Sequence, residues 1–332
     1  MAENQEPAQD IQQQAADYLL ELLRDFRNPC PWQGHAPERT DPSVSDVLDI
    51  LCSRRFTHLS QTQSLPYRES MQGQLKADLS ARRALRFCYD LGGGYHASLE
   101  ADFTGLRFAP GLGELLALRQ ILGFSRAIER LYPPGVHFRL VIDNLCAWKA
   151  NDIALEHTEG YLAQLQALIN DLGLHERIEI LAESRVINAD LYQASFDRLQ
   201  PPLRTGTVSI SDRENVSRFV GHACTEEQTR CYLERYQHAQ AISEPLLARH
   251  LDGIRLTQRA SAQGFGFRSF PGGDARLQSG EVDLLICQGS RPKPMLLTTK
   301  NRQRYRRWAL GPEDLPADWP LAPGVVHVAT AS

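Results

Sequence analysis

The stretch RFCYDLGGGYHASL (residues 86–99) contains the pattern on which the predicted fold of this chain rests. An apolar run ends at Asp90, and three consecutive glycines and a polar cluster follow it. This order is typical of the first strand of a nucleotide-binding sheet and its ligand-contacting loop, because glycines let the backbone approach a bound molecule closely. A glycine-rich turn packed against a helix would show the same pattern, so the flanking sequence has to decide.

The flanking sequence alternates between strand and helix patterns. Buried-strand patterns cover residues 84–91, 137–144 and 177–184, and amphipathic helix patterns cover 111–132 and 158–174. Strands and helices that alternate in this way, with right-handed crossovers, form a parallel sheet with helices on both faces. We therefore predict an α/β fold with a Rossmann-like, doubly wound parallel sheet.

The remaining segments suggest a two-part organisation. Residues 1–80 contain a helix pattern at 11–27 and a shorter one at 43–56, and we predict that they form a helical N-terminal cap. Residues 81–332 are predicted to form the catalytic domain. Within it we expect a helix over 211–240 that continues to 257, closing strands, and a glycine-rich lid loop; the closing strands are 282–289, 293–300 and 324–332, and the loop is 263–280.

The composition of the chain argues against two classes of function, nucleic-acid binding and membrane insertion. The chain has 332 residues, is 42% hydrophobic and has a formal net charge of −4, which is typical of a soluble globular protein and argues against a nucleic-acid binder. A basic cluster at 300–308 is read as a solvated strand or helix face, with an anion site as the alternative. No segment approaches the roughly 18 apolar residues of a membrane span, and we expect no membrane partner.

Cysteine use and the N-terminal sequence point to a cytoplasmic protein. The seven cysteines are scattered without CxxC spacing, which indicates reduced thiols, and the polar, acidic start does not resemble a signal peptide. Cys30 and His35 are not followed by a second ligand pair at zinc-finger spacing, so no metal site is predicted.

Polar residues end all three predicted strands, and ligands bind at this edge of a doubly wound sheet. The D-x-G-G-G segment that begins at Asp90 is similar to the first motif of class I S-adenosylmethionine-dependent enzymes, although His96 replaces the third alternate glycine. The dozen residues after the glycines are expected to lie over the ligand. The predicted ligand-binding residues are Asp90, Gly92, Gly93, Gly94, Arg107, Phe108, Asp143 and Glu183.

The block GLGELLALRQILGFSRAIERLYPPGVHFRLVIDNLCAWKANDI (111–153) resembles the core of the isocyanide (isonitrile) synthase family. This family includes the pyoverdine/paerucumarin and dityrosine biosynthesis proteins. YPPG (132–135) is the most specific piece, and a weaker resemblance extends from about residue 18 to residue 240. The resemblance implies an enzyme that builds an isonitrile from the amine of an aromatic amino acid and a carbon of ribulose 5-phosphate.

Two ligand-facing segments depart from the family pattern. The glycine stretch stands where the family has a P-A-x-x-x-K-S-P-N type loop, and IDNLCAWKAND (142–152) replaces S-D-G-x-x-F-x-D, with Asn144 in place of the glycine. The lysine and serine suited to a sugar phosphate are missing, which suggests a different small molecule in the same pocket. The combination resembles S-adenosylmethionine-dependent azetidine-2-carboxylate synthases, which act in non-ribosomal peptide pathways.

In that reaction S-adenosylmethionine is the substrate: its amine attacks its own γ-carbon and methylthioadenosine leaves. The predicted catalytic residues are Asn144 and Ser184, as neutral partners of the amine, and Tyr95, near the sulfonium. Asp143 is expected at the ribose. Three alternatives remain: an isonitrile synthase acting on tyrosine or tryptophan with ribulose 5-phosphate, a class I methyltransferase, and a non-enzymatic nucleotide-binding protein.

Overall fold

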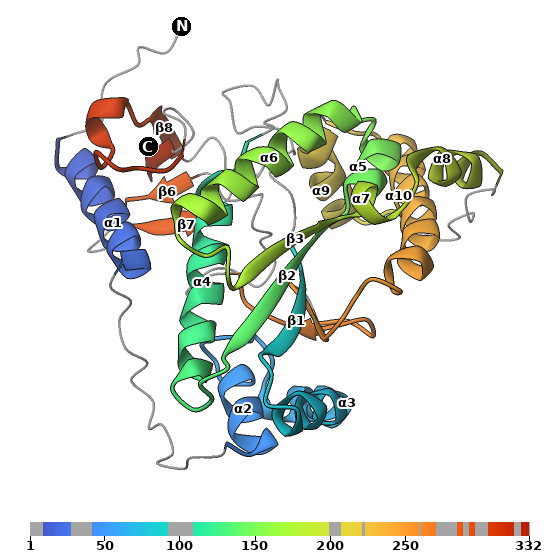
Figure 1. Ribbon diagram of the computed structural model, residues 1–332. Helices are drawn as coiled ribbons and strands as arrows, with labels where there is room; N and C mark the ends of the chain where they lie inside the picture. Colours follow the sequence, from blue (N-terminus) through green and yellow to red (C-terminus); the bar gives the residue numbers. More distant parts are fainter. Residues whose placement is uncertain are drawn as a thin grey trace, which may run out of the picture.

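The computed structural model describes residues 9–27, 42–91, 109–198, 207–220, 223–258, 260–269, 284–287, 292–295, 305–321 and 327–331. A central parallel sheet is flanked by helices, and a smaller sheet lies near the C-terminus (Figure 1). The strands are β1 (Leu85–Asp90), β2 (Val136–Ile142), β3 (Ile178–Ala182), β4 (Ile254–Thr257), β5 (Phe265–Gly266), β6 (Leu284–Ile286), β7 (Lys293–Met295), β8 (Tyr305–Ala309) and β9 (His327–Ala331).

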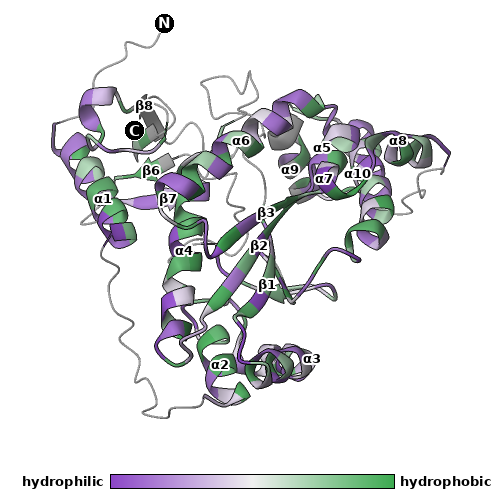
Figure 2. Ribbon diagram, in the orientation of Figure 1, coloured by the Kyte–Doolittle hydropathy of each residue, from purple (hydrophilic) through white to green (hydrophobic). Residues whose placement is uncertain are grey.

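The helices fall into an N-terminal group, one long central helix and a C-terminal group around the sheet edge. They are α1 (Gln9–Arg27), α2 (Val44–Leu51), α3 (Gln61–Ser80), α4 (Leu112–Glu129), α5 (Asn144–Asn151), α6 (Leu155–Asp171), α7 (Glu183–Val186), α8 (Ala189–Arg198), α9 (Ile210–Val220) and α10 (Glu226–Leu247), with a 3₁₀ helix, η3 (Pro312–Asp314). In Figure 2, peripheral helices such as α1 and α10 show both polar and apolar residues, as expected for helices with one buried face.

The predicted fold class is confirmed. The main sheet has the order β3-β2-β1-β4-β5, and every neighbouring pair is parallel. β1, β2 and β3 match the three predicted strands, and α4 and α6 provide the crossovers between them. The sheet is therefore doubly wound: β2 and β3 extend it on one side of β1, and β4 and β5 extend it on the other.

Helix α4 lies in the centre of the hydrophobic core. Most of its residues are buried, which is typical of a helix covered on nearly all sides. Its Phe124 meets Phe87 of β1 edge-to-face at 5.3 Å between ring centroids, and Phe138 of β2 at 5.9 Å. The buried carboxylate of Glu114 accepts hydrogen bonds from the Gly111 amide and the Tyr161 hydroxyl, so this charged group has partners inside the core.

The two predicted N-terminal helices are present as α1 and α2, a third helix, α3, follows them, and the three helices pack at two places. α1 packs against α4, η3 and β9, whereas α2 and α3 pack against each other and against α4 and β1 (Figure 1). All three contribute side chains to the same hydrophobic cluster as the main sheet. The division of the chain at residue 80 stays a prediction.

Two expectations for the C-terminal half are corrected. The helix expected to reach residue 257 ends at Leu247, and residues 254–257 form β4 instead. Gly253, which precedes β4, has a φ of +122°, a conformation that favours glycine and that no helix residue adopts. The predicted lid loop 263–280 is described only up to residue 269, and in that part Phe265–Gly266 form β5 of the main sheet.

The three predicted closing strands are found as β6, β7 and β9. Together with β8 they form a separate four-stranded sheet of order β7-β6-β9-β8, with parallel and antiparallel pairs. β8 includes the last residues of the basic cluster, which agrees with the expected strand. Within the described residues, no helix combines the length and apolar character that a membrane crossing requires.

Candidate functional site at the carboxyl ends of the strands

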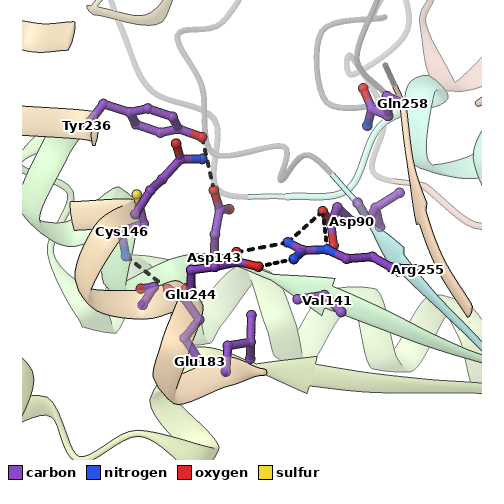
Figure 3. A pocket seen from close by; sticks show the side chains of 13 residues that line it. Asp90, Val141, Asp143, Cys146, Glu183, Tyr236, Glu244, Arg255 and Gln258 are labelled. Atoms are coloured by element: carbon purple, nitrogen blue, oxygen red, sulfur yellow. Dashed lines mark hydrogen bonds and ion pairs between the residues drawn. The ribbon is translucent and has the colours of Figure 1, made fainter. Parts of the chain in front are cut away.

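A cavity of about 210 Å³ opens at the carboxyl ends of the central strands, where β1 separates the two halves of the sheet. This is the topological switch point at which doubly wound folds bind their ligands. The cavity extends between the strand ends and helix α10 (Figure 3). Its described lining consists of Asp90, Leu91, Val141, Asp143, Cys146, Glu183, Tyr236, Gln240, Ser243, Glu244, Leu247, Arg255 and Gln258.

The three carboxylates predicted from the strand ends meet in this cavity. Asp90 is the last residue of β1, Asp143 lies between β2 and α5, and Glu183 begins α7 directly after β3. Parallel strands end at the same edge of a sheet, which is why residues 40 to 93 positions apart in the chain come together. The structure thus confirms the convergence of these side chains; their roles toward a ligand stay predictions.

Asp90 shares the guanidinium of Arg255 with Glu244 of α10. Arg255, from β4, donates to Asp90 Oδ2 from Nε at 3.2 Å and from Nη2 at 3.1 Å, and Nη2 also lies 3.2 Å from Glu244 Oε2. Burial raises the pKa of Asp90 to about 6, and Arg255 opposes that rise. The second carboxylate oxygen, Oδ1, is buried and has no hydrogen-bond partner among the described residues, so it can accept one from a ligand.

Glu183 is held at the first turn of α5. Its Oε2 accepts hydrogen bonds from the backbone amides of Leu145 and Cys146, both at 3.0 Å, and the residue is only 2% exposed. Free amides at a helix N-terminus stabilise negative charge. Burial, followed by the nearby charge of Asp143, nevertheless raises the pKa of Glu183 to about 8.

Asp143 faces α10. The hydroxyl of Tyr236 donates to Asp143 Oδ2 at 3.5 Å (Figure 3). Burial, together with the neighbouring carboxylates, raises the pKa of Tyr236 well above its ordinary value, so the phenol stays protonated and remains a donor. Tyr236 is stacked on Tyr232 with ring centroids 6.3 Å apart, which fixes the position of the hydroxyl.

Asn144 and Ser184, predicted as catalytic partners of an amine, are hydrogen-bonded to one another, and their role toward a ligand stays a prediction. The Asn144 side chain donates to Ser184 Oγ at 2.8 Å, and its Oδ1 accepts from the Ser184 amide at 3.0 Å. Ser184 Oγ in turn donates to Glu159 at 2.6 Å. Neither residue belongs to the described lining of the cavity. Because their polar groups tie the end of β2 to the end of β3 and to α6, the geometry gives them a role in joining these elements.

Six predicted site residues lie outside the described residues: Gly92, Gly93, Gly94, Tyr95, Arg107 and Phe108. Conversely, the structure adds residues that the sequence reading missed. Tyr236, Gln240, Ser243, Glu244 and Leu247 recur on one face of α10 at helical spacing, and this spacing is the signal that would have identified them once the helix was placed over the strand ends.

The described lining is acidic. It contains four carboxyl groups and one cation, Arg255, which is engaged by two of them. Its apolar members are Leu91, Val141 and Leu247. Within the described part of the chain, no group of three or more His, Cys, Asp or Glu side chains is arranged to hold a metal ion. The cavity therefore favours cations and hydrogen-bond donors over anions.

Comparison with known proteins identifies solved structures with a similar fold. No protein-family model matches the chain, and no curated protein matches it. Among solved structures, it is similar to the PvcA protein of Pseudomonas aeruginosa, with a TM-score of 0.63, 16% identity, and coverage of 82% of this chain and 97% of PvcA. The likeness shows a shared fold along most of the chain.

Two more distant structures are tyrosyl-tRNA synthetases. That of Aeropyrum pernix has a TM-score of 0.32 and 12% identity, and covers 64% of this chain and 52% of its own. The enzyme of Pyrococcus horikoshii, complexed with L-tyrosine, has a TM-score of 0.29 and 12% identity. The match covers 65% of this chain and 50% of the synthetase. Likeness at this level supports no functional argument.

Proposed function

We propose that this chain is an enzyme of secondary metabolism that cyclises S-adenosylmethionine to azetidine-2-carboxylate and methylthioadenosine. The observation that favours this reaction is the acidic lining of the cavity at the switch point. S-adenosylmethionine brings a sulfonium and an ammonium, both cationic, and two ribose hydroxyls that donate hydrogen bonds. Each of these groups suits a cavity in which carboxylates outnumber cations.

The same lining disfavours a sugar phosphate in the described part of the cavity. Two unit charges 4 Å apart interact by about 4 kcal/mol at the effective dielectric constant typical of a protein surface. A phosphate beside Asp143 or Glu244 would meet this repulsion, and Arg255 is already shared by Asp90 and Glu244. The charge distribution therefore supports a cationic substrate over ribulose 5-phosphate.

In this proposal Asp90 binds the ribose. Its buried Oδ1 accepts a ribose hydroxyl, while Oδ2 stays on Arg255. This assignment is an alternative to the expected placement of the ribose at Asp143. Asp143 lies beside Tyr236 and faces the amino end of the substrate, where the reacting nitrogen must be held in line with the γ-carbon and sulfur.

The direct test is to incubate the purified protein with S-adenosylmethionine alone and to measure both products by mass spectrometry. An intramolecular displacement needs no acceptor, so methylthioadenosine and azetidine-2-carboxylate should form in equal amounts. Asp90→Asn should raise KM by roughly tenfold to a hundredfold, because a hydrogen bond to a charged group contributes about 1.5–3 kcal/mol. Asp171→Asn, at the exposed end of α6, is the matched control and should leave KM unchanged.

A second candidate function, isonitrile formation, is favoured by the fold shared with PvcA. It predicts that tyrosine or tryptophan mixed with ribulose 5-phosphate yields a product with an isonitrile infrared band. A methyltransferase would instead release S-adenosylhomocysteine, and only with an acceptor present. If S-adenosylmethionine yields neither cyclisation product while the isonitrile band forms, the cyclase proposal is overturned in favour of the isonitrile synthase.

A further inference from the structure

Three side chains form a bridge across the cavity, from the strand ends to helix α10: Asp90 of β1, Arg255 of β4 and Glu244 of α10. The guanidinium of Arg255 lies between the two carboxylates (Figure 3). Its Nη2 is 3.1 Å from Asp90 Oδ2 and 3.2 Å from Glu244 Oε2, and its Nη1 donates to Glu244 Oε1. We call these three residues the Arg255 bridge.

The Arg255 bridge has one negative charge in excess. Two carboxylates share one guanidinium, and within the described part of the chain neither carboxylate forms an ion pair with another cation. Burial raises the pKa of Asp90 to about 6, so this carboxyl is ionised at pH 7.5. A ligand group beside the bridge therefore meets a net negative charge in a partly buried setting, where interactions between charges are stronger than in water.

We propose that Glu244 makes the cavity specific for a nucleoside whose sulfur is positively charged, over a neutral nucleoside of the same size. The inference rests on the proposed function, because it uses the ribose site at Asp90. It deepens that function by naming the residue that selects the charge of the sulfur. Glu244 is a specificity-determining residue, and it takes no part in bond formation or cleavage.

Binding of the ribose brings the sulfur close to the Arg255 bridge. Asp90 Oδ1 is buried and has no hydrogen-bond partner among the described residues, whereas Oδ2 of the same carboxyl is held by Arg255. In S-adenosylmethionine a single methylene joins the sulfonium to the ribose, so a ribose held at Oδ1 keeps the sulfur within about 8 Å of the bridge. One unit charge at that distance, at an effective dielectric constant of about 20, changes a binding constant on the order of tenfold or more.

The charge that Glu244 selects disappears from sulfur during the proposed reaction. The nitrogen lone pair forms the bond to the γ-carbon, the carbon–sulfur bond breaks, and the electron pair of that bond stays on sulfur. The positive charge passes to the azetidine nitrogen, and methylthioadenosine is a neutral thioether that the bridge attracts less than the substrate. Because the charge on sulfur has already decreased in the transition state, Glu244 stabilises the bound substrate at least as much as the transition state.

Glu244→Gln tests the proposal, because it removes the excess charge while the amide oxygen can still accept a hydrogen bond from Arg255. The matched probes are sinefungin, in which a carbon bearing an ammonium replaces the sulfonium, and S-adenosylhomocysteine, in which the sulfur is neutral. Isothermal titration calorimetry at pH 7.5 measures the dissociation constant of each. We expect the wild-type protein to prefer sinefungin by about tenfold or more, and Glu244→Gln to lose about tenfold of that preference through weaker binding of sinefungin alone.

Glu226→Gln is the matched control. Glu226 also pairs with an arginine, Arg230, but it lies at the start of α10, about 27 Å from Glu244 along the helix axis. This variant should keep the wild-type preference. In turnover of S-adenosylmethionine, Glu244→Gln should raise KM by about tenfold without lowering kcat, whereas loss of a group that acts on the bond changes would lower kcat.

The specificity proposal and the cyclase can fail independently. If Glu244→Gln keeps the wild-type preference, or weakens the binding of both ligands equally, the specificity proposal is overturned, while formation of both products would still support the cyclase. If the preference depends on Glu244 but S-adenosylmethionine alone yields no cyclisation product, the specificity proposal stands and the cyclase is overturned. If the wild-type protein binds neither ligand, both proposals are overturned.

Discussion

At the scale of single residues, the cavity depends on one guanidinium placed between two carboxylates. The exposed fraction of the side chain is 17% for Arg255, 33% for Asp90 and 37% for Glu244. If the guanidinium of Arg255 is lost, the carboxylates of Asp90 and Glu244 stay partly buried without a positive partner, which is unfavourable. The arrangement should therefore be more important for stability when Asp90 is ionised than when it is protonated.

Arg255→Met tests this dependence. Above pH 6 Asp90 is ionised in the folded protein, and loss of the guanidinium should lower the free energy of unfolding by about 2 kcal/mol. Below pH 6 Asp90 takes up a proton and needs the cation less, so the loss should be smaller at pH 5 than at pH 8. Urea unfolding of both proteins at the two pH values measures the difference. An equal loss at both would show that Asp90 is not the group that Arg255 stabilises.

At the scale of elements, the junction between β1 and β4 is limited by the backbone of Gly253. A Cβ at this position would lie 2.3 Å from the carbonyl oxygen of Arg86, and its φ of +122° is unfavourable for other residues. Because β4 pairs with β1 directly after this glycine, the register that places Arg255 beside Asp90 depends on it.

Gly253→Ala should therefore lower the free energy of unfolding by roughly 3 kcal/mol or more, through both the clash and the backbone strain. Gly173→Ala is the control: its φ is +67°, but no atom lies within 4 Å of the added methyl group, so it should cost only about 1–2 kcal/mol. Thermal or urea unfolding compares the two. Equal losses would mean that the close approach of the two strands is relieved by a small backbone shift.

At the scale of the whole molecule, the first 80 residues and the main sheet share one hydrophobic core. Leu19, Leu48, Phe56, Met71 and Leu75 belong to the same cluster as the strands, and the Phe56 ring contacts Phe124 edge-to-face at 5.2 Å. Burying five such side chains contributes about 10 kcal/mol, which is comparable to the whole stability of a typical domain.

We therefore expect a chain that begins at residue 81 to lose cooperative unfolding, although the predicted division of the sequence places a domain boundary there. The cooperativity of unfolding is measured by circular dichroism in increasing urea, for the shortened chain and for the full chain. Phe56→Ala in the full chain should lower the free energy of unfolding by about 3–4 kcal/mol, and the variant should still unfold cooperatively. A cooperative transition in the shortened chain would instead support a separable N-terminal cap.

The sequence by itself determined the doubly wound class, the three central strands and the meeting of Asp90, Asp143 and Glu183. These features follow from local rules: apolar runs of strand length alternate with amphipathic helices, and the last residues of parallel strands share one edge of the sheet. The sequence predicts helix up to residue 257, but residues 254–257 pair with β1 and form strand β4, and such pairing between distant segments is a tertiary contact.

Only the tertiary structure decided which polar groups face the cavity. Asn144 and Ser184 directly follow Asp143 and Glu183 after the ends of β2 and β3, yet they bond to each other. Neighbouring residues at the start of a helix point in directions about 100° apart, so the position of α5 and α7 over the sheet selects which one faces the ligand. Tyr236, Glu244 and Arg255 join the site through contacts between segments distant in sequence, and no local pattern encodes such contacts.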